Sequence, residues 1–378
     1  SETLNPLKIM KRLTDIFVEL VKIDSVSSRE KDIADHIMAF LSRLDRHPSN
    51  KKPFTIYTDN SQAKTNSNTG NVICRIGSGG NFVLLSHMDT VEPTKNLTPV
   101  VSEDRITSDG TTILGADNRA GIASILYALE NAITKGKELK DFTIAFTTCE
   151  ETTLGGSKNI ELPETIKYGF VFDSSYPPGK YISSSCGAIS FEIKVRGRAS
   201  HSGISPEKGI HSILIASNAI ASLNIGRVDE ETTLNIGMIQ GGTAVNVVPE
   251  LTTINGEIRS FDRDKIIREK EKLISAFDSK VKELNGLFTY NDFWDFDPYT
   301  HSPDDDIVKI IESAMLKAEI TPIPTVSFGG SDANSLNGRG VKAVNLGIGA
   351  QNPHSVDEFI LIEDLEKTAS LAFNLITV

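Results

Sequence analysis

The stretch that most constrains the fold is the apolar run at residues 82–85, which leads directly into His87 and Asp89. A run of this length, bounded by Gly80 and Pro93, predicts a buried strand of an α/β sheet. Ligands of open α/β sheets bind where such strands end. Residues two apart on a strand point to the same side, so the Asp89 carboxylate can orient the His87 ring toward a metal. A lone His-x-Asp motif also occurs in ordinary polar turns, and its meaning depends on the rest of the chain.

Two more apolar strands are predicted to end in acids. Residues 142–147 lead to Glu150 and Glu151, and residues 168–172 lead to Asp173. Adjacent carboxylates at the end of an apolar strand repel each other unless a cation or a shared proton stabilises them. The pair therefore indicates a bound cation more strongly than a solvated acidic run would.

Two residues in turns complete the candidate site. Asp117 lies in a glycine-bearing turn at the start of a helix, where a carboxylate is commonly just a cap, and His354 follows the predicted strand at 341–346. Imidazoles and carboxylates without thiolates suit zinc, with cobalt or manganese as alternatives, and a carboxylate can bridge two ions. The sequence thus predicts two metal ions per chain. The five candidate ligands are His87, Asp117, Glu151, Asp173 and His354.

Glu150, adjacent to the candidate ligand Glu151, is a candidate catalytic residue. A two-metal site that activates a water needs a nearby carboxylate to accept the proton and pass it to a leaving amine. Glu150 is placed for that task.

The order of predicted elements divides the chain into two domains of different architecture. Residues 1–186 and 298–378 read as one α/β domain, and residues 187–297 read as β-α-β-β-α-β, the order of a ferredoxin-like unit. Near the N-terminus, Asn5 is expected to cap a first helix, and Ser27 to Glu30 to form the capping box of a second.

Charge and composition exclude several classes of partner. The 378 residues carry 39 basic and 50 acidic side chains, a net charge of −11, which disfavours nucleic acid and anionic membranes as main partners. No stretch has the length of a membrane span, and the polar N-terminus lacks a signal-peptide pattern. Three scattered cysteines argue against a disulfide framework. We therefore expect a cytoplasmic protein.

Five segments, in this order, resemble a known family of co-catalytic zinc metallopeptidases. They are Ser86–Val91, Gly115–Gly121, Cys149–Glu151, Val171–Asp173 and Asn352–Ser355. The family includes peptidase T, a tripeptide aminopeptidase, together with glutamate carboxypeptidase and the succinyl-diaminopimelate and acetylornithine deacylases. The chain is most similar to peptidase T, by residues 115–121 and by the motif at 197–203. The resemblance covers nearly the whole chain and implies a mixed-sheet catalytic domain with an inserted lid and dimerisation domain.

The resemblance also implies a role for each site residue. His87 and Asp173 would bind one zinc, Glu151 and His354 the other, and Asp117 would bridge them. Asp89 would orient His87, and Glu150 would be the general base. In the inserted domain, the resemblance implies that His201 stabilises the oxyanion, often in a partner subunit's site, and that Asn246 and Arg259 bind substrate. By the residues alone, His201 could be an ordinary surface histidine and Arg259 a structural ion pair.

The expected function is a di-zinc aminopeptidase that removes the N-terminal residue from short peptides, in particular tripeptides. The expected partners are the peptide substrate and a second copy of the chain, bound through the inserted domain. An N-acyl-amino-acid deacylase or a carboxypeptidase would use the same chemistry. A metal-free binding module that keeps the fold is the third alternative, and the intact acid cluster counts against it.

Overall fold

The computed structural model describes residues 6–378, so the predicted cap Asn5 lies outside the described residues. The chain divides into two compact units. Unit 1 comprises the chain up to Ser183, His301–Val326 and Ser331–Val378, and unit 2 comprises Ser184–Thr300 and Ser327–Gly330. Unit 2 contains the predicted insertion at 187–297 and adds short flanking segments. Among residues 6–378, no helix has the length and apolar character needed to cross a membrane.

Unit 1 is built on a mixed sheet, which confirms the predicted fold class. The strands of the sheet are β1 (Phe54–Thr58), β2 (Val72–Ile76), β3 (Phe82–His87), β6 (Phe142–Thr147), β7 (Tyr168–Ser174), β8 (Lys180–Ser185), β15 (Ile323–Ser327) and β16 (Lys342–Gly347), together with the edge strand β14 (Tyr299–Thr300), whose residues belong to unit 2. Their order is β1-β2-β6-β3-β7-β16-β8-β14, and β15 also pairs with β8. The central pairs β6–β3, β3–β7 and β7–β16 are parallel, and the β1–β2, β2–β6 and β16–β8 pairs are antiparallel.

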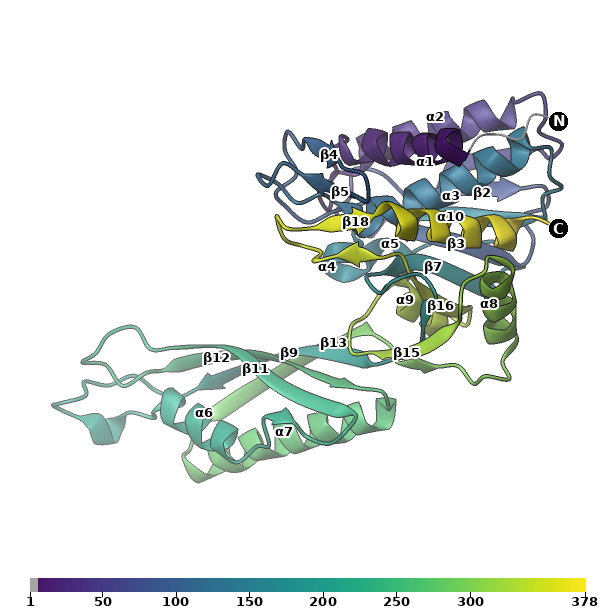
Figure 1. The fold of residues 1–378 in the computed structure, drawn as a ribbon. Coiled ribbons are helices and arrows are strands. Elements are labelled where there is room, and N and C mark those ends of the chain that lie inside the picture. Colours follow the sequence, from purple (N-terminus) through teal and green to yellow (C-terminus); the bar gives the residue numbers. More distant parts are fainter. Residues whose placement is uncertain (1–5) are drawn as a thin grey trace. The chain divides into compact units, whose positions relative to one another are not determined.

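Helices cover this sheet on both faces. They are α1 (Pro6–Val21), α2 (Lys31–Asp45), α3 (Ala116–Thr134), α4 (Glu150–Thr153), α5 (Gly155–Lys158), α8 (Asp306–Lys317), α9 (Asp332–Gly338) and α10 (Ile362–Ile376). Helices α1, α3 and α10 pack on one another, as Figure 1 shows, and share a core with Leu84, Phe170 and Phe172. Since Val83, Leu85 and Val171 point the other way, the central strands are apolar on both faces.

Two small elements complete unit 1. A four-stranded sheet is formed by β4 (Pro99–Val101), β5 (Arg105–Ser108), β17 (Ala350–Gln351) and β18 (Phe359–Leu361), and a short 3₁₀ helix, η1, covers Ser61–Ala63. Strand β18 pairs with β5, so it holds the segment after His354 beside the segment that precedes α3.

The predicted capping box of the second helix is wrong. Helix α2 starts at Lys31, and Glu30 occupies the N-cap position. The Ser27 hydroxyl donates to Asp89 Oδ2 at 2.6 Å, and Glu30 Oε1 accepts from the backbone N–H groups of Ser28 and Cys149. Asp89 and Cys149 lie far along the chain, and the contacts with them draw both side chains away from the helix terminus that the local pattern would have them cap.

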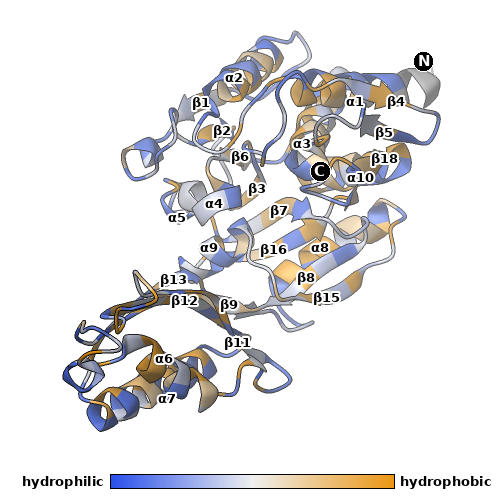
Figure 2. Ribbon diagram, turned by 90° about the vertical axis from the view of Figure 1, so that its left-hand side faces the viewer, coloured by the Kyte–Doolittle hydropathy of each residue, from blue (hydrophilic) through white to orange (hydrophobic). Residues whose placement is uncertain are grey.

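Unit 2 is an antiparallel sheet with two helices. Its elements are β9 (Gly187–Arg196), η2 (Pro206–Lys208), α6 (Ser212–Ala221), β10 (Gly226–Arg227), β11 (Thr232–Gly241), β12 (Leu251–Ser260), α7 (Arg263–Glu283) and β13 (Leu287–Phe296). The strand order is β10-β11-β12-β9-β13. Phe191, Ile215 and Phe277 lie in its separate core. In Figure 2, α7 carries both hydrophilic and hydrophobic residues, as expected for a helix with one buried face.

The short segment Ser327–Gly330 packs with unit 2 although it lies far along the chain. The Phe328 ring is 4.8 Å from that of Phe261, and the Arg227 guanidinium lies 4.6 Å from its centre. Gly330 lies against Phe296, so close that a Cβ at this position would come within 2.5 Å of the ring. The segment is therefore an integral part of the unit.

Candidate metal centre

The candidate ligands gather at one edge of the unit 1 sheet. His87 ends β3, Asp173 lies near the end of β7, and Glu150 and Glu151 begin α4 just after β6. Because β6, β3 and β7 are parallel neighbours, their carboxyl ends meet at the same edge. The parallel pairing of these strands therefore brings the side chains together.

Asp117 lies between the two imidazoles. Its Oδ1 is 3.0 Å from His87 Nε2, and its Oδ2 is 3.3 Å from His354 Nε2. The N-cap of α3 is Gly115, and Asp117 has non-helical dihedral angles, so its carboxylate is turned into the cluster rather than used as a cap. One carboxylate with one oxygen beside each histidine has the arrangement of a bridging ligand.

The other carboxylates fall on either side of Asp117. Asp173 Oδ1 is 3.1 Å from His87 Nε2, and Glu151 Oε1 is 2.9 Å from His354 Nε2. Ligand atoms of His87, Asp117 and Glu151 lie within 4.8 Å of one another, as do those of His87, Glu150 and Asp173. The structure therefore brings together all five predicted ligands and Glu150.

The electrostatics of this cluster fit divalent cations. Burial raises the pKa of Glu150 well above its usual value and raises that of Asp173. Hydrogen bonds to Asp117 and Glu151 raise the pKa of His354 to about 10. Burial opposes protonation of His87, but the neighbouring carboxylates raise its pKa well above the usual range. The carboxylates thus favour positive charge at both imidazoles, and a divalent cation bound here would supply that charge and meet a set of nitrogen and oxygen ligands.

Asp89 contacts both sides of the cluster. His87 Nδ1 lies 2.9 Å from the Asp89 backbone oxygen and 3.4 Å from Oδ1, so the backbone makes the closer contact and directs Nε2 toward the other ligands. The Asp89 carboxylate accepts from the backbone N–H groups of Glu150 and Glu151 at 2.9 and 3.1 Å. Asp89 therefore holds the turn that carries these two glutamates, a contact that the sequence did not reveal.

Three further buried residues near the cluster were missed by sequence reasoning. Asn118 Nδ2 donates to Asp173 Oδ1 at 3.1 Å, which a carboxylate at this position could not do unless protonated. Arg119 donates to the backbone oxygen of Met88 at 2.7 Å and so ties α3 to the end of β3. Glu358 accepts backbone N–H groups from the Asp117 segment. The signal that the sequence offers for these residues is their position: Asn118 and Arg119 lie within the motif Gly115–Gly121, and Glu358 follows the motif Asn352–Ser355. The contacts themselves join distant parts of the chain.

His201 and Asn246 lie in neighbouring loops of unit 2. Both are exposed, His201 bridges to Val247 in the antiparallel sense, and the Asn246 backbone oxygen accepts from Ser202 N at 3.0 Å. His201 Nδ1 accepts from Gly203 N and Ile204 N, both at 3.2 Å. In the neutral ring the proton is therefore on Nε2, which can donate a hydrogen bond outward.

Arg259 already has partners within unit 2. Its Nε and Nη2 donate to Glu257 at 3.0 and 2.9 Å, and its Nη1 donates to the Phe328 backbone oxygen at 2.7 Å. These contacts use three of the five N–H groups of the guanidinium, and the Cys186 thiol is a further neighbour of Arg259. The structural ion pair that the sequence left open is therefore present.

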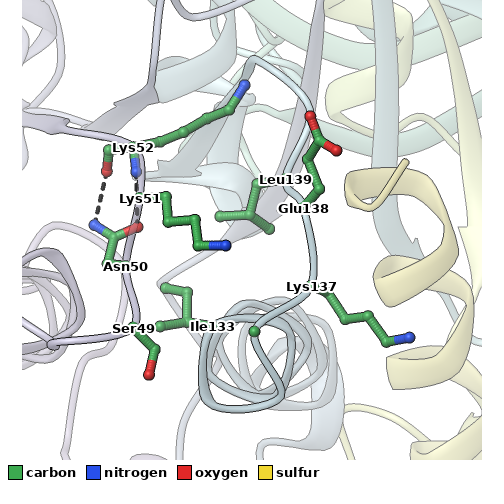
Figure 3. Close-up of a pocket in the computed structure, with 9 residues that line it drawn as sticks. Ser49, Asn50, Lys51, Lys52, Ile133, Lys137, Glu138 and Leu139 are labelled. Carbon is green, nitrogen blue, oxygen red and sulfur yellow. Dashed lines mark hydrogen bonds between the residues drawn. The ribbon is translucent and has the colours of Figure 1, made fainter.

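A separate cavity of about 480 Å³ lies away from the cluster (Figure 3). Its lining residues are Ser49, Asn50, Lys51, Lys52, Ile133, Gly136, Lys137, Glu138 and Leu139. They precede β1 and β6, whereas Glu150 follows β6, so the cavity lies at the opposite end of that strand. Lys52 pairs with Asp141, and Glu138 adds a carboxylate, so the lysines here are partly neutralised.

Comparison with known proteins agrees with this geometry. The model of Peptidase family M20/M25/M40 matches residues 83–377. Peptidase T of Clostridium perfringens is 31% identical over 293 residues, which cover 72% of this chain and 68% of that protein. The uncharacterized protein YqjE of Bacillus subtilis is 34% identical over 372 residues, 97% of this chain and 98% of that protein.

A solved structure extends the likeness to the whole fold. The crystal structure of aminopeptidase PepT from Bacillus cereus superposes with a TM-score of 0.89 at 33% identity, and covers 97% of this chain and 98% of that one. The family predicted from five short motifs is thereby confirmed: the chain belongs to Peptidase family M20/M25/M40.

Proposed function

We propose that this chain is a metal-dependent aminopeptidase that removes the N-terminal residue from tripeptides. The observation that carries the proposal is the position of Asp117 between His87 and His354, with the partly buried Glu150 beside them. Relatives named Peptidase T and aminopeptidase PepT support the substrate class.

We propose two cations per chain, with zinc as the metal and cobalt or manganese as alternatives. His87 and Asp173 would hold one, Glu151 and His354 the other, and Asp117 would contact both. When bound, such cations polarise a scissile carbonyl and make a water more acidic. The nitrogen and oxygen ligand atoms of His87, Asp117 and Glu151 lie within 4.8 Å of one another, as do those of His87, Glu150 and Asp173, which supports the assignment.

Glu150 is proposed as the general base. Its Oε2 is 3.9 Å from His87 Nε2, and its side chain is only 10% exposed. In this position the carboxylate would take a proton from the attacking water and give it to the nitrogen of the leaving amine. Asp89 fixes the backbone of the same residue, which limits the positions that this carboxylate can adopt.

The roles proposed for unit 2 concern substrate. His201 would donate from Nε2 to the developing oxyanion, and Asn246 and Arg259 would bind the peptide. The unit would act as a lid and as the interface of a homodimer, as the family resemblance implies. A cytoplasmic location is supported by the thiols of Cys74 and Cys149, which are buried and form no disulfide.

A substrate panel tests the function. We expect cleavage of a free tripeptide to an amino acid and a dipeptide. The N-acetylated tripeptide should have a kcat/KM at least about 100-fold lower. Acetylation removes the free α-amine, and the polar groups of an aminopeptidase site that bind this amine are then left without a partner. An N-acetyl amino acid should not be cleaved. Release of acetate or of the C-terminal residue would instead identify a deacylase or a carboxypeptidase.

Arg259→Met tests the carboxylate clamp. A charge-assisted hydrogen bond contributes about 1.5–3 kcal/mol, so kcat/KM for a tripeptide should fall about 10- to 150-fold. The tripeptide amide, which lacks the carboxylate, should be a poor substrate of the parent and should lose little more in the variant. Glu257→Gln is the matched control, because it breaks the same ion pair and keeps the guanidinium. Equal losses in both variants would mean that the ion pair is structural.

A further inference from the structure

The buried carboxylate of Glu358 contacts the segment that carries Asp117. Its side chain is 1% exposed, Oε2 accepts from Gly115 N at 2.7 Å, and Oε1 accepts from Asp117 N at 3.0 Å. The two donors lie more than 240 positions earlier in the chain. One carboxylate therefore uses both oxygens to hold one short stretch of backbone.

That stretch of backbone is irregular. Gly115 has a φ of 74°, in the left-handed region, and Asp117 has a ψ of 99°, far from helical values. The first N–H groups of a helix have no partners within the helix, so an external acceptor must satisfy them when they are buried. Glu358 accepts a hydrogen bond from the backbone N–H of Asp117 and so holds the backbone of this residue. The direction of the Asp117 side chain therefore depends on this contact.

Glu358 is also linked to the turn that carries His354. It lies four residues after His354, and its own N–H donates to the Ser355 backbone oxygen at 3.1 Å. The turn that carries His354 and the segment that carries Asp117 are thus joined through one side chain. The distance of 3.3 Å between Asp117 Oδ2 and His354 Nε2 is set where these two segments meet.

We propose that Glu358 is a positioning residue, which fixes the Asp117 carboxylate between His87 and His354 so that it can contact both cations. The proposal rests on the metal site of the proposed function. Partners that orient metal ligands typically contribute 10- to 100-fold in metal affinity. In Glu358→Gln the side chain keeps its size but presents one oxygen and one NH₂, so one of the two backbone donors loses its acceptor.

The experiment measures zinc affinity of the full chain by competition titration at 25 °C. Glu358→Gln should bind zinc about 10- to 100-fold more weakly than the parent. Glu363→Gln is the matched control, because this glutamate is exposed, pairs only with Lys367 in the described structure, and should leave zinc affinity unchanged. Circular dichroism at 25 °C establishes that each variant is folded. If Glu358 contributed only to the stability of the fold, a variant that is folded would bind zinc with the affinity of the parent.

Glu358→Asp keeps the charge and draws the carboxylate back by one methylene, and it is the second variant if the glutamine variant does not fold. Weaker zinc binding in this variant would support the proposal. Affinity within about twofold of the parent in a folded variant overturns it. In that case a parent chain that still binds two zinc ions leaves the proposed function intact, whereas a parent that binds none overturns both.

Discussion

Replacing Glu150 with glutamine should lower kcat for a tripeptide by at least about 100-fold and leave both metal sites filled. The amide cannot accept a proton from the attacking water, and general-base catalysis is typically worth 10²–10⁴ in rate. The side chain keeps its size, and the backbone bond from Glu150 N to Asp89 is unaffected. Steady-state kinetics on the free tripeptide, together with elemental analysis of the same sample, measure both quantities.

Glu151→Gln is the matched control for that experiment. The two glutamates are adjacent, but Glu151 Oε1 lies 2.9 Å from His354 Nε2, so its loss should remove metal as well as activity. If the Glu150 variant loses metal and the Glu151 variant keeps it, the two roles have been exchanged.

Removing the metals should abolish turnover. We expect zinc-loaded protein to contain two ions per chain, and a strong chelator to remove activity that returns on addition of zinc. Metal binding to the folded chain also stabilises it, by about 2.7 kcal/mol at a free metal concentration 100 times Kd, so the metal-free protein should have the lower Tm. Elemental analysis and thermal unfolding monitored by circular dichroism measure these changes.

Asp117→Ala sharpens the metal prediction. Because Asp117 has one oxygen beside each histidine, its loss should weaken both sites together rather than remove one ion. Zinc content that stays at zero in the parent, with all five ligands intact, would contradict the two-metal site. Activity that survives exhaustive chelation would contradict it as well.

The sequence predicted those parts of the site that depend on local pattern. Apolar strands ending in His87, Glu150 and Asp173 are recognisable because the pattern of a buried strand is local, and parallel neighbours then bring the ends together. The choice between cap and ligand for Asp117 was left open, and in the structure Gly115 is the N-cap while the irregular backbone at the start of α3 turns the Asp117 carboxylate toward the histidines. The family was recognisable from the order of five such motifs.

The contacts that hold the site in place could not be predicted in this way. Glu358 and Asn118 act through partners 241 and 55 positions away, and no local periodicity encodes such a pairing. The same cause made the predicted capping box wrong, since Ser27 is used by Asp89. The ion pair of Arg259 with Glu257 is, in contrast, a local contact. Residues two apart on a strand share a face, so the sequence pattern could have predicted it.

The place of Phe328 in unit 2 bears on how this protein can be recombined with its relatives. An exchange of residues 187–297 alone would leave Phe328 facing side chains that did not evolve with it, in place of Arg227, Phe261 and Arg259. A chimera should therefore take residues 327–330 from the same parent as residues 187–297, with the closely packed Gly330 and Phe296 as a matched pair. The modular piece is discontinuous in sequence, and crossover points placed only at the ends of residues 187–297 would separate its two parts.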